Sequence, residues 1–184
     1  MYKILLTALT FFLGGCAGTS SYYVLSNAAV PKKHYAVKTG TIGVEKVHVP
    51  KYLFKREIAV AKSSHEIVFL SSAQWGEDMD EGLTRRVISY LRHSFDQPNV
   101  FAYPWGMNTQ PDIKVRVDIT RFIAQNGKVY LDANWYIENM HTGRKKSKLF
   151  STAVASQKDA EGIVSAMDQA FGQLETSLAE DIRH

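Results

Sequence analysis

Cysteine is almost absent from the sequence, since Cys16 is the only one among 184 residues. A single thiol excludes a disulfide framework within the chain. It also excludes the multi-cysteine clusters that hold many structural zinc ions. In an exported protein an unpaired cysteine would be a reactive thiol, so its position near the N-terminus has to explain its presence.

Long apolar runs and a strong excess of charge are lacking too. After residue 15, no stretch approaches the roughly twenty apolar residues of a membrane-spanning helix. The formal net charge is +4, and setting aside Lys3 of the expected leader leaves +3, from 21 basic and 18 acidic residues. No basic block or aromatic–basic stripe accompanies this charge. That argues against nucleic acid as a partner and fits loose attraction to an anionic surface.

Common catalytic and metal-binding motifs are also missing. Neither the nucleophile motif Gly-x-Ser-x-Gly nor a glycine-rich phosphate loop occurs. None of the six histidines is paired at the four-residue helical spacing of a zinc site; they are His34, His48, His65, His93, His141 and His184. We therefore expect a protein that is not an enzyme, with no catalytic residue, no cofactor and no bound metal.

The first sixteen residues follow the order of an export signal. Lys3 supplies a positive charge, and the apolar run from Ile4 to Leu13 has the length of a signal core. Small residues precede the cysteine in Leu13-Gly14-Gly15-Cys16, which resembles the lipobox of bacterial lipoproteins. The resemblance implies that residues 1–15 are removed. It also implies that Cys16 then carries a diacylglycerol on its sulfur and an acyl chain on its amino group.

Two other interpretations of this segment are an ordinary signal peptide with an incidental cysteine and an uncleaved anchor. We prefer the lipobox because charge, apolar run, small pair and cysteine all occur in the required order. One acyl chain holds a protein on a membrane only marginally, whereas two or more hold it firmly. Ala17 stands where an Asp retains lipoproteins of enteric bacteria on the inner membrane. The resemblance thus favours the outer membrane and a periplasm-facing domain.

The rest of the chain has the length and composition of one domain with a hydrophobic core. After a flexible tether at 18–21, strands are predicted at 22–25, 41–50, 57–62, 66–70, 100–103, 112–124, 128–139 and 147–155. The segment 41–50 is expected to be covered on both faces. Strands interleaved with two long amphipathic helices predict an α/β domain, a mixed sheet flanked by those helices. We place the lipidated N-terminus, tether and short strand at 16–40 and the domain at 41–184.

The two strands around Asn126-Gly127 allow two registers. A two-residue turn would pair Val117 with Tyr136, whereas a three-residue loop pairs Val117 with Trp135. The second register puts the apolar residues of both strands on one face. We therefore expect a three-residue loop with Gly127 in the left-handed conformation, because a one-residue slip would turn the apolar set outward.

Each of the two helices is expected to begin at a capping-box pattern. Asp78 and Glu81 mark the first; Ser156 and Asp159 mark the second, which runs from about 158 to 182. The expected buried stripes are Leu83, Val87, Tyr90, Leu91 and Ser94 in the first helix, and Ile163, Met167, Ala170, Phe171, Leu174, Leu178 and Ile182 in the second. Arg85, Arg86 and Arg92 fall mostly off the first stripe. Asp78, Asp80 and Glu81 suit the positive end of the helix dipole, so they need no chemical role.

Two tryptophans are candidates for contact with a partner. Trp75 lies just before the first helix, where we expect it mainly to fill the core, with a contact surface as the alternative. Trp105 lies in the turn-rich segment Pro104–Met107, where a large aromatic residue is often an interface anchor. Core and interface stay equally open for Trp105.

Several segments occur in an order that resembles one known family. A β-rich opening follows the cysteine, and a segment of tryptophan, acidic and apolar residues precedes the first helix. The segments are Tyr22–Leu25, Ile42–Val44, Val49–Leu53, Arg56–Val60, Ala73–Met79, Asp118–Phe122, Val129–Trp135, Ala166–Met167 and Leu174. Together they are similar to the ABC-type transport auxiliary lipoproteins, the family of paraquat-inducible protein C, over nearly all of the chain after the leader. Two residues depart from the pattern, Gly76 in place of the usual Ala and Asn134 in place of a common basic residue.

The resemblance implies an auxiliary subunit of a system that moves lipid between the inner and outer membranes. The implied partners are a tunnel protein with mammalian-cell-entry (MCE) domains and its inner-membrane ABC transporter. The lipoprotein would dock the far end of the tunnel at the outer membrane and support envelope integrity; self-association into a ring is left open. The alternative is a periplasmic carrier or chaperone that binds acyl chains itself, which needs a continuous apolar pocket.

Overall fold

The computed structural model describes residues 20–25, 30–35, 40–106 and 110–183, and the leader and Cys16 lie outside these ranges. In chain order the elements are β1 (Ser21–Tyr23), β2 (Ile42–Val44), the 3-10 helix η1 (Lys51–Phe54), β3 (Glu57–Ala61), β4 (Ile67–Trp75), α1 (Met79–Ser94), β5 (Val100–Ala102), β6 (Ile113–Gln125), β7 (Lys128–Asn139), β8 (Lys145–Ala155) and α2 (Ala160–Ile182). No helix in the described ranges is long and apolar enough to cross a membrane.

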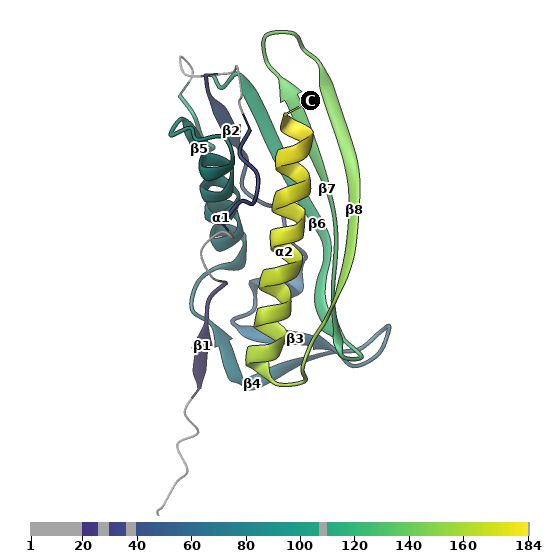
Figure 1. Cartoon of the computed structure of the whole chain (residues 1–184). Helices are drawn as coiled ribbons and strands as arrows, with labels where there is room; N and C mark the ends of the chain where they lie inside the picture. Colours follow the sequence, from purple (N-terminus) through teal and green to yellow (C-terminus); the bar gives the residue numbers. More distant parts are fainter. Residues whose placement is uncertain (1–19, 26–29, 36–39, 107–109, 184) are drawn as a thin grey trace, which may run out of the picture.

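The strands form one mixed sheet of eight strands, which confirms the predicted fold class. The antiparallel strands β6, β7 and β8 form its tall part (Figure 1). On its other side β6 pairs in parallel with β2 near its start and with β3 near its end. β5 extends the sheet beyond β2, while β4 and then β1 extend it beyond β3. The sheet therefore has two branches at opposite ends of β6.

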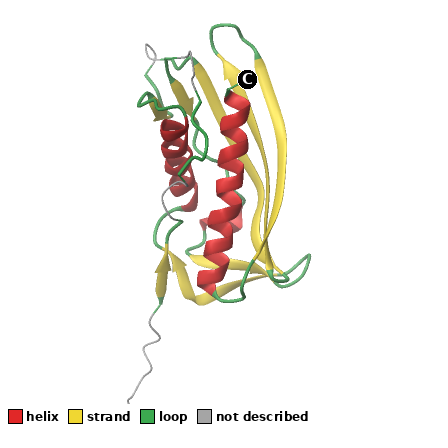
Figure 2. Cartoon of the chain, in the orientation of Figure 1, coloured by secondary structure: helices red, strands yellow, loops and turns green. Residues whose placement is uncertain are grey.

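Both helices cover one face of this sheet (Figure 2). The residues of β6 and β7 alternate between buried and more exposed positions, as expected for a sheet covered on one side. Trp135, Phe122 and Leu131 are completely buried on the covered face. Every residue of the two predicted helical stripes is buried as well. Each large apolar side chain buried in this way contributes about 1.5–3 kcal/mol to stability.

Two strand predictions differ from the structure in length. The segment 41–50 forms a strand only over β2, because after Val44 the chain leaves β5 and touches β6 again through the isolated bridge between His48 and Asp118. β4 is longer than predicted and continues to Trp75, where β1 pairs with it. Both differences arise from strand partners that are distant in the sequence, and local alternation does not reveal them.

The hairpin of β6 and β7 has the expected strand register and an unexpected turn. Val117 pairs with Trp135, as predicted. Gln125 nevertheless pairs with Lys128, so the loop consists of two residues, Asn126 and Gly127, both with positive φ. That conformation is typical of a two-residue hairpin turn with Asn-Gly. The register shifts by one residue between Ile119 and Arg121, and this bulge restores the apolar pairing that the two-residue turn alone would have lost.

Each helix begins within two residues of its predicted start, but the predicted capping boxes do not form. Asp78 is at the N-cap of α1, and its side chain makes no capping hydrogen bond. At α2 the N-cap is Asp159 rather than Ser156, and its Oδ1 accepts a hydrogen bond from the Gly162 N–H at 2.7 Å. The N-cap side chain thus accepts a backbone hydrogen bond at α2 but not at α1, where the Glu81 N–H donates instead to Oδ1 of Asp80 at 2.9 Å.

One arginine expected off the buried stripe of α1 is buried between the helices. The Arg86 side chain is only 4% exposed, and its Nη2 donates to Oε2 of Glu175 on α2 at 2.9 Å. A second carboxylate, that of Asp168, accepts from Nη1. The guanidinium also lies 5.1 Å from the centre of the Phe171 ring. Arg86 therefore joins α1 to α2, and the predicted position for it was wrong.

Candidate docking site

The end of the domain opposite β1 carries the most distinctive surface. β1, the first element after the segment that contains Cys16, lies at one end of the molecule (Figure 1). At the other end lie β2, β5 and the turn that joins β7 to β8 (Figure 1). A protein held through residues that precede β1 would present this second end away from its anchor.

Trp105 belongs to an aromatic cluster at this end. Its ring meets those of Tyr103 and Phe101 edge-on, with centroid distances of 4.9 and 6.3 Å. The indole N–H donates to Oε1 of Gln110 at 2.9 Å, which fixes the orientation of the ring. A Cβ atom on Gly43 would lie 2.9 Å from the Trp105 ring, so glycine at this position allows close packing of the ring on β2.

The cluster is buried on one side and exposed on the other. Trp105 is half-buried, while Tyr103 beside it is 57% exposed. Large aromatic side chains held in a fixed orientation and partly exposed are typical anchors of protein interfaces. The burial of Trp105 is thus intermediate, and contact with a partner stays a prediction.

Trp75, the other candidate, lies in the core. It is the last residue of β4, and only 3% of it is exposed. Its ring fills space beside the start of α1, in agreement with the core interpretation. The Trp75 indole N–H is buried without a hydrogen-bond partner among the described residues. Its ring is therefore inaccessible to a partner in this conformation.

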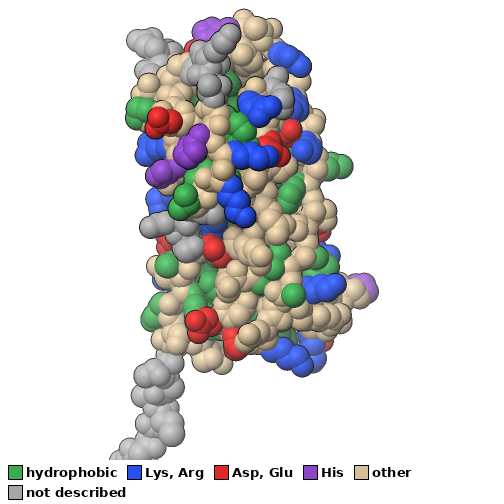
Figure 3. Space-filling model, viewed as in Figure 1, with side chains coloured by type: hydrophobic (Ala, Val, Ile, Leu, Met, Phe, Trp, Pro, Cys, Tyr) green, Lys and Arg blue, Asp and Glu red, His purple; other side chains and the backbone are tan. Residues whose placement is uncertain are grey.

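A basic corner lies at the same end, at the start of β8. We use this name for Arg144, Lys145, Lys146 and Lys148. Figure 3 shows several lysine and arginine side chains gathered in the upper part of the visible face, around the C-terminal end of α2. This corner was not predicted from the sequence, and the expectation that the chain has no basic block was wrong. The run Arg-Lys-Lys-Ser-Lys at residues 144–148 was the signal.

The carboxylate of Asp181 ties the basic corner to α2. It accepts hydrogen bonds from Lys146 Nζ at 2.9 Å and from the Trp135 indole at 3.1 Å, and Lys148 Nζ lies 3.4 Å away. Burial acts to raise the pKa of Asp181, but the hydrogen bond from Lys146 and the two lysine charges outweigh it, and the pKa is lowered. Lys146 and Lys148 therefore pair with the same carboxylate, and the basic corner keeps a net positive charge.

An open groove of about 430 Å³ runs along the outer face of the sheet near the basic corner. Its lining includes Lys114, Arg116 and Lys145 together with the half-exposed ring of Tyr136. Arg116 lies over this ring, 5.4 Å from its centre. The groove also contains carboxylates that pair with its cations, so it is a polar surface rather than a site for an acyl chain.

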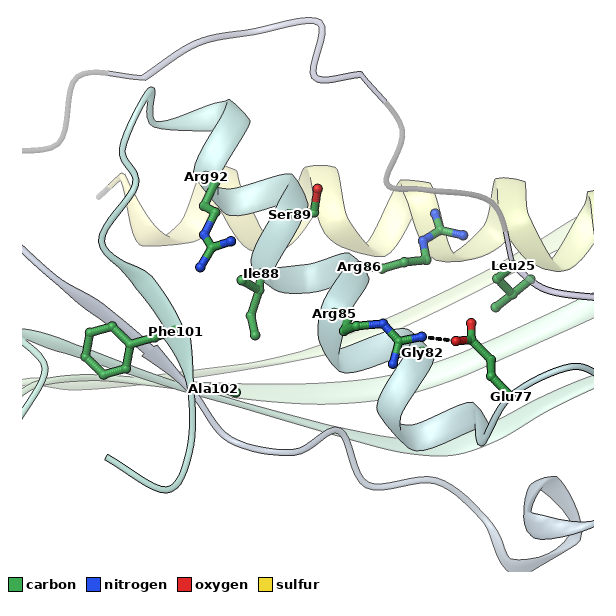
Figure 4. A pocket seen from close by; sticks show the side chains of 10 residues that line it. All are labelled: Leu25, Glu77, Gly82, Arg85, Arg86, Ile88, Ser89, Arg92, Phe101 and Ala102. Atoms are coloured by element: carbon green, nitrogen blue, oxygen red, sulfur yellow. Dashed lines mark hydrogen bonds and ion pairs between the residues drawn. The ribbon is translucent and has the colours of Figure 1, made fainter. Parts of the chain in front are cut away.

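A second groove of about 470 Å³ follows α1 (Figure 4). Figure 4 shows Arg85 directed at Glu77, and an ion pair joins the two side chains. Arg92 donates to the backbone carbonyl of Val100 at 2.7 and 3.0 Å. Each of these arginines already has a partner, so the groove is not a free anion site. Phe101, at one end of the groove, connects it with the aromatic cluster.

The described residues offer no arrangement that suggests catalysis or metal binding. No group of three or more metal-ligating side chains is found among them. Asp112 binds both Thr41 and His141, and these hydrogen bonds, first that from His141, lower the pKa of its carboxyl group. The Thr41 hydroxyl donates to the carboxylate rather than to the imidazole, so this trio lacks the order of a nucleophile, base and acid. Its contacts fix the β7–β8 turn.

Comparison with protein families gives one match. The family model described as "ABC-type transport auxiliary lipoprotein component" matches residues 23–179. None of the curated proteins compared with the chain matches it. The match covers most of the chain, from β1 to the last turns of α2, and agrees with the resemblance that the sequence motifs indicated.

Two solved structures have the same fold. Protein XCC0632 from Xanthomonas campestris, of the family DUF330, superimposes with a TM-score of 0.73 at 19% identity, covering 87% of this chain and 93% of its own. An uncharacterized protein superimposes with a TM-score of 0.71 at 21% identity, covering 89% of this chain and 99% of its own. At such low identities, these likenesses show the fold alone.

Proposed function

Because the chain belongs to the family of ABC-type transport auxiliary lipoprotein components, we propose that it is the lipid-anchored docking subunit of an MCE-type lipid transporter. In this proposal Cys16 carries the lipid, and the outer membrane holds the protein with its domain in the periplasm. The end opposite β1 contacts the MCE-domain tunnel protein. The protein acts by binding and positioning its partner rather than by catalysis.

The observation that carries the proposal is the arrangement of the two ends. The segment after Cys16 enters the domain through β1, while the aromatic cluster around Trp105 and the basic corner lie at the far end (Figure 1). Four residues separate Cys16 from Ser21, so an extended connection of about 17 Å would hold β1 near the membrane. The far end would then face the periplasm, where a tunnel that spans it must terminate.

The second candidate, a carrier that binds acyl chains itself, has less support. Such a protein needs a continuous apolar pocket. The grooves beside α1 and on the outer sheet face are open, and charged side chains line both. Between helices and sheet, the large apolar side chains of Trp135 and Phe171 are completely buried in the core.

Capture of the MCE-domain protein tests the proposal. The full-length chain, purified from membranes in detergent, should retain the MCE-domain protein encoded by the same genome. Replacing Trp105 by Ala should weaken this retention by about tenfold or more, because interface aromatics are often worth 2 kcal/mol or more. The matched control is Phe54→Ala, which removes a 59% exposed aromatic side chain in η1. Equal retention by both variants would show that Trp105 is not a contact residue. Repeated absence of any MCE-domain protein would overturn the proposal.

A further inference from the structure

β8 forms a long outer edge of the sheet. Its eleven residues pair with β7, and no described strand pairs with its other side. An extended segment of this length spans roughly 35 Å. Alternate residues of such an edge direct backbone N–H and C=O groups away from the sheet, so a further strand can bind by main-chain hydrogen bonds.

Positive charge is concentrated on the first half of this edge. Lys145 points to the outer face, where Glu138 lies 3.3 Å away, and it is 74% exposed. Lys146 and Lys148 point to the other face, where they share Asp181. With Arg144, the corner holds four cations against these two carboxylates, an excess of two positive charges. An incoming strand would meet lysines on both of its faces.

This charge argues against a second copy of β8 as the occupant. Lysines on edge strands commonly discourage pairing with other chains. In a parallel pair, a second β8 would place its own lysines beside these. In an antiparallel pair, the lysines would face Thr152–Ala155, which has no charge. Neither arrangement neutralises the corner, whereas a strand that carries carboxylates does.

Leu149, the residue after the lysines, indicates that the partner segment also carries an apolar side chain. Leu149 is 84% exposed, an unusual exposure for a large apolar side chain at the middle of a strand. It shares the outer face with Lys145, because side chains alternate along β8. An apolar side chain on a neighbouring strand would cover Leu149. A carboxylate four residues away would reach Lys145 on the same face, and carboxylates one and three residues away would reach Lys148 and Lys146 on the other face.

We propose that the edge of β8 from Lys145 to Leu149 binds an extended acidic segment of a partner protein, which adds to the sheet as a further strand. Its carboxylates lie beside Lys145, Lys146 and Lys148, and an apolar residue covers Leu149. The proposal rests on the docking function above and names the surface and partner chemistry for it. The lysines favour a partner segment that carries negative charge. Hydrogen bonds to the backbone edge of β8 set the register of the added strand.

A synthetic peptide tests this assignment. The probe has ten residues, with one leucine near its centre, glutamates one, three and four residues to either side of the leucine, and valine or threonine elsewhere. The protein is the full chain in detergent micelles. We expect binding that weakens about fivefold or more between 50 and 500 mM salt, because the contacts are charged and exposed. Hydrogen exchange should slow at the amides of residues 145–155 that point away from β7. The same peptide with N-methyl groups on alternate amides should not bind, since it cannot form the strand ladder.

Variants and alternative occupants complete the test. Arg144→Glu with Lys145→Glu should weaken peptide binding about tenfold or more. Lys55→Glu with Lys158→Glu, an equal charge change at exposed positions elsewhere, should leave peptide binding unchanged.

Equal binding by the N-methylated peptide, or unchanged hydrogen exchange in β8, would overturn the proposal. So would protection of β8 by phosphatidylglycerol vesicles in place of the peptide, or protection that rises with protein concentration in its absence. Peptide binding without capture of an MCE-domain protein would contradict only the proposed function.

Discussion

The carboxyl group of Glu175 is a buried titratable group in the interior of the domain. Burial raises its pKa from 4.5 to about 7, although the charge and hydrogen bonds of Arg86 act to lower it; the nearby carboxylate of Asp168 raises it further. Between these two pH values the folded protein binds more protons than the unfolded chain. The stabilisation from protonating Glu175 is therefore fully present below about pH 4.5 and is lost as the pH rises through about 7.

Replacing Glu175 by Gln should remove this pH dependence. The difference in unfolding free energy between wild type and Glu175→Gln should fall by about 1–3 kcal/mol from pH 4.5 to pH 8, since one pKa unit corresponds to about 1.4 kcal/mol. Urea denaturation at several pH values measures it. The control is Glu161→Gln, the same change at an exposed position. Parallel pH profiles for wild type and Glu175→Gln would contradict the assignment.

Some residues could be placed from the sequence, and others needed the tertiary structure. The apolar stripe of α2 followed from its spacing alone, because burial of an apolar side chain requires only a face toward the core. Arg86 could not be placed in this way. Its burial depends on Glu175 and Asp168, which are more than 80 positions away in the sequence and lie on another helix.

At the scale of elements, the two helices differ in how their first turns are capped. The Asp159 side chain accepts a hydrogen bond from Gly162, while that of Asp78 makes no capping bond. Asp159→Ala should therefore lower the unfolding free energy by about 1 kcal/mol. The matched variant Asp78→Ala should lower it by less than half as much, because only the dipole interaction is lost. Urea denaturation of both variants at pH 7 checks the difference, and equal losses would contradict the capping geometry.

The β6–β7 hairpin shows which part of an element is predictable. Its strand register followed from the apolar pattern, because a buried face tolerates no slip. The turn was wrong, since a two-residue loop and a bulge near Thr120 together produce the register expected from a three-residue loop. The Thr120 hydroxyl donates to the carbonyl of Asp132 across this bulge. Nothing in local alternation distinguishes the two solutions.

The candidate site was predicted only in part for a related reason. Trp105 was recognised from its turn-rich surroundings. The rest of its cluster, however, comes from β2, β5 and residues 110–111, which the sheet brings together. The basic corner was visible as a run of residues. Its excess charge depends on Asp181 of α2, and therefore on the tertiary structure.

At the scale of the whole molecule, membrane anchoring and folding depend on different parts of the chain in the proposed arrangement. The core, the sheet and both helices lie within residues 20–183, and none of their described contacts requires the lipid. The lipid proposed on Cys16 would act only through the short connection to β1. A substitution that abolishes attachment to the membrane should therefore leave the stability of the domain unchanged.

Two substitutions near the N-terminus test this separation. Cys16→Ala should leave a folded domain, with thermal unfolding within about 2 °C of wild type, that is absent from the membrane fraction because no acyl chain holds it. Ala17→Asp keeps the cysteine, so it should remain membrane-bound and, in an envelope with enteric-type sorting, move to the inner membrane. Membrane fractionation and mass spectrometry of the N-terminal peptide measure both outcomes. An unfolded Cys16→Ala domain, or a wild-type peptide with a free thiol, would contradict the lipid tether without affecting the assignment of the fold.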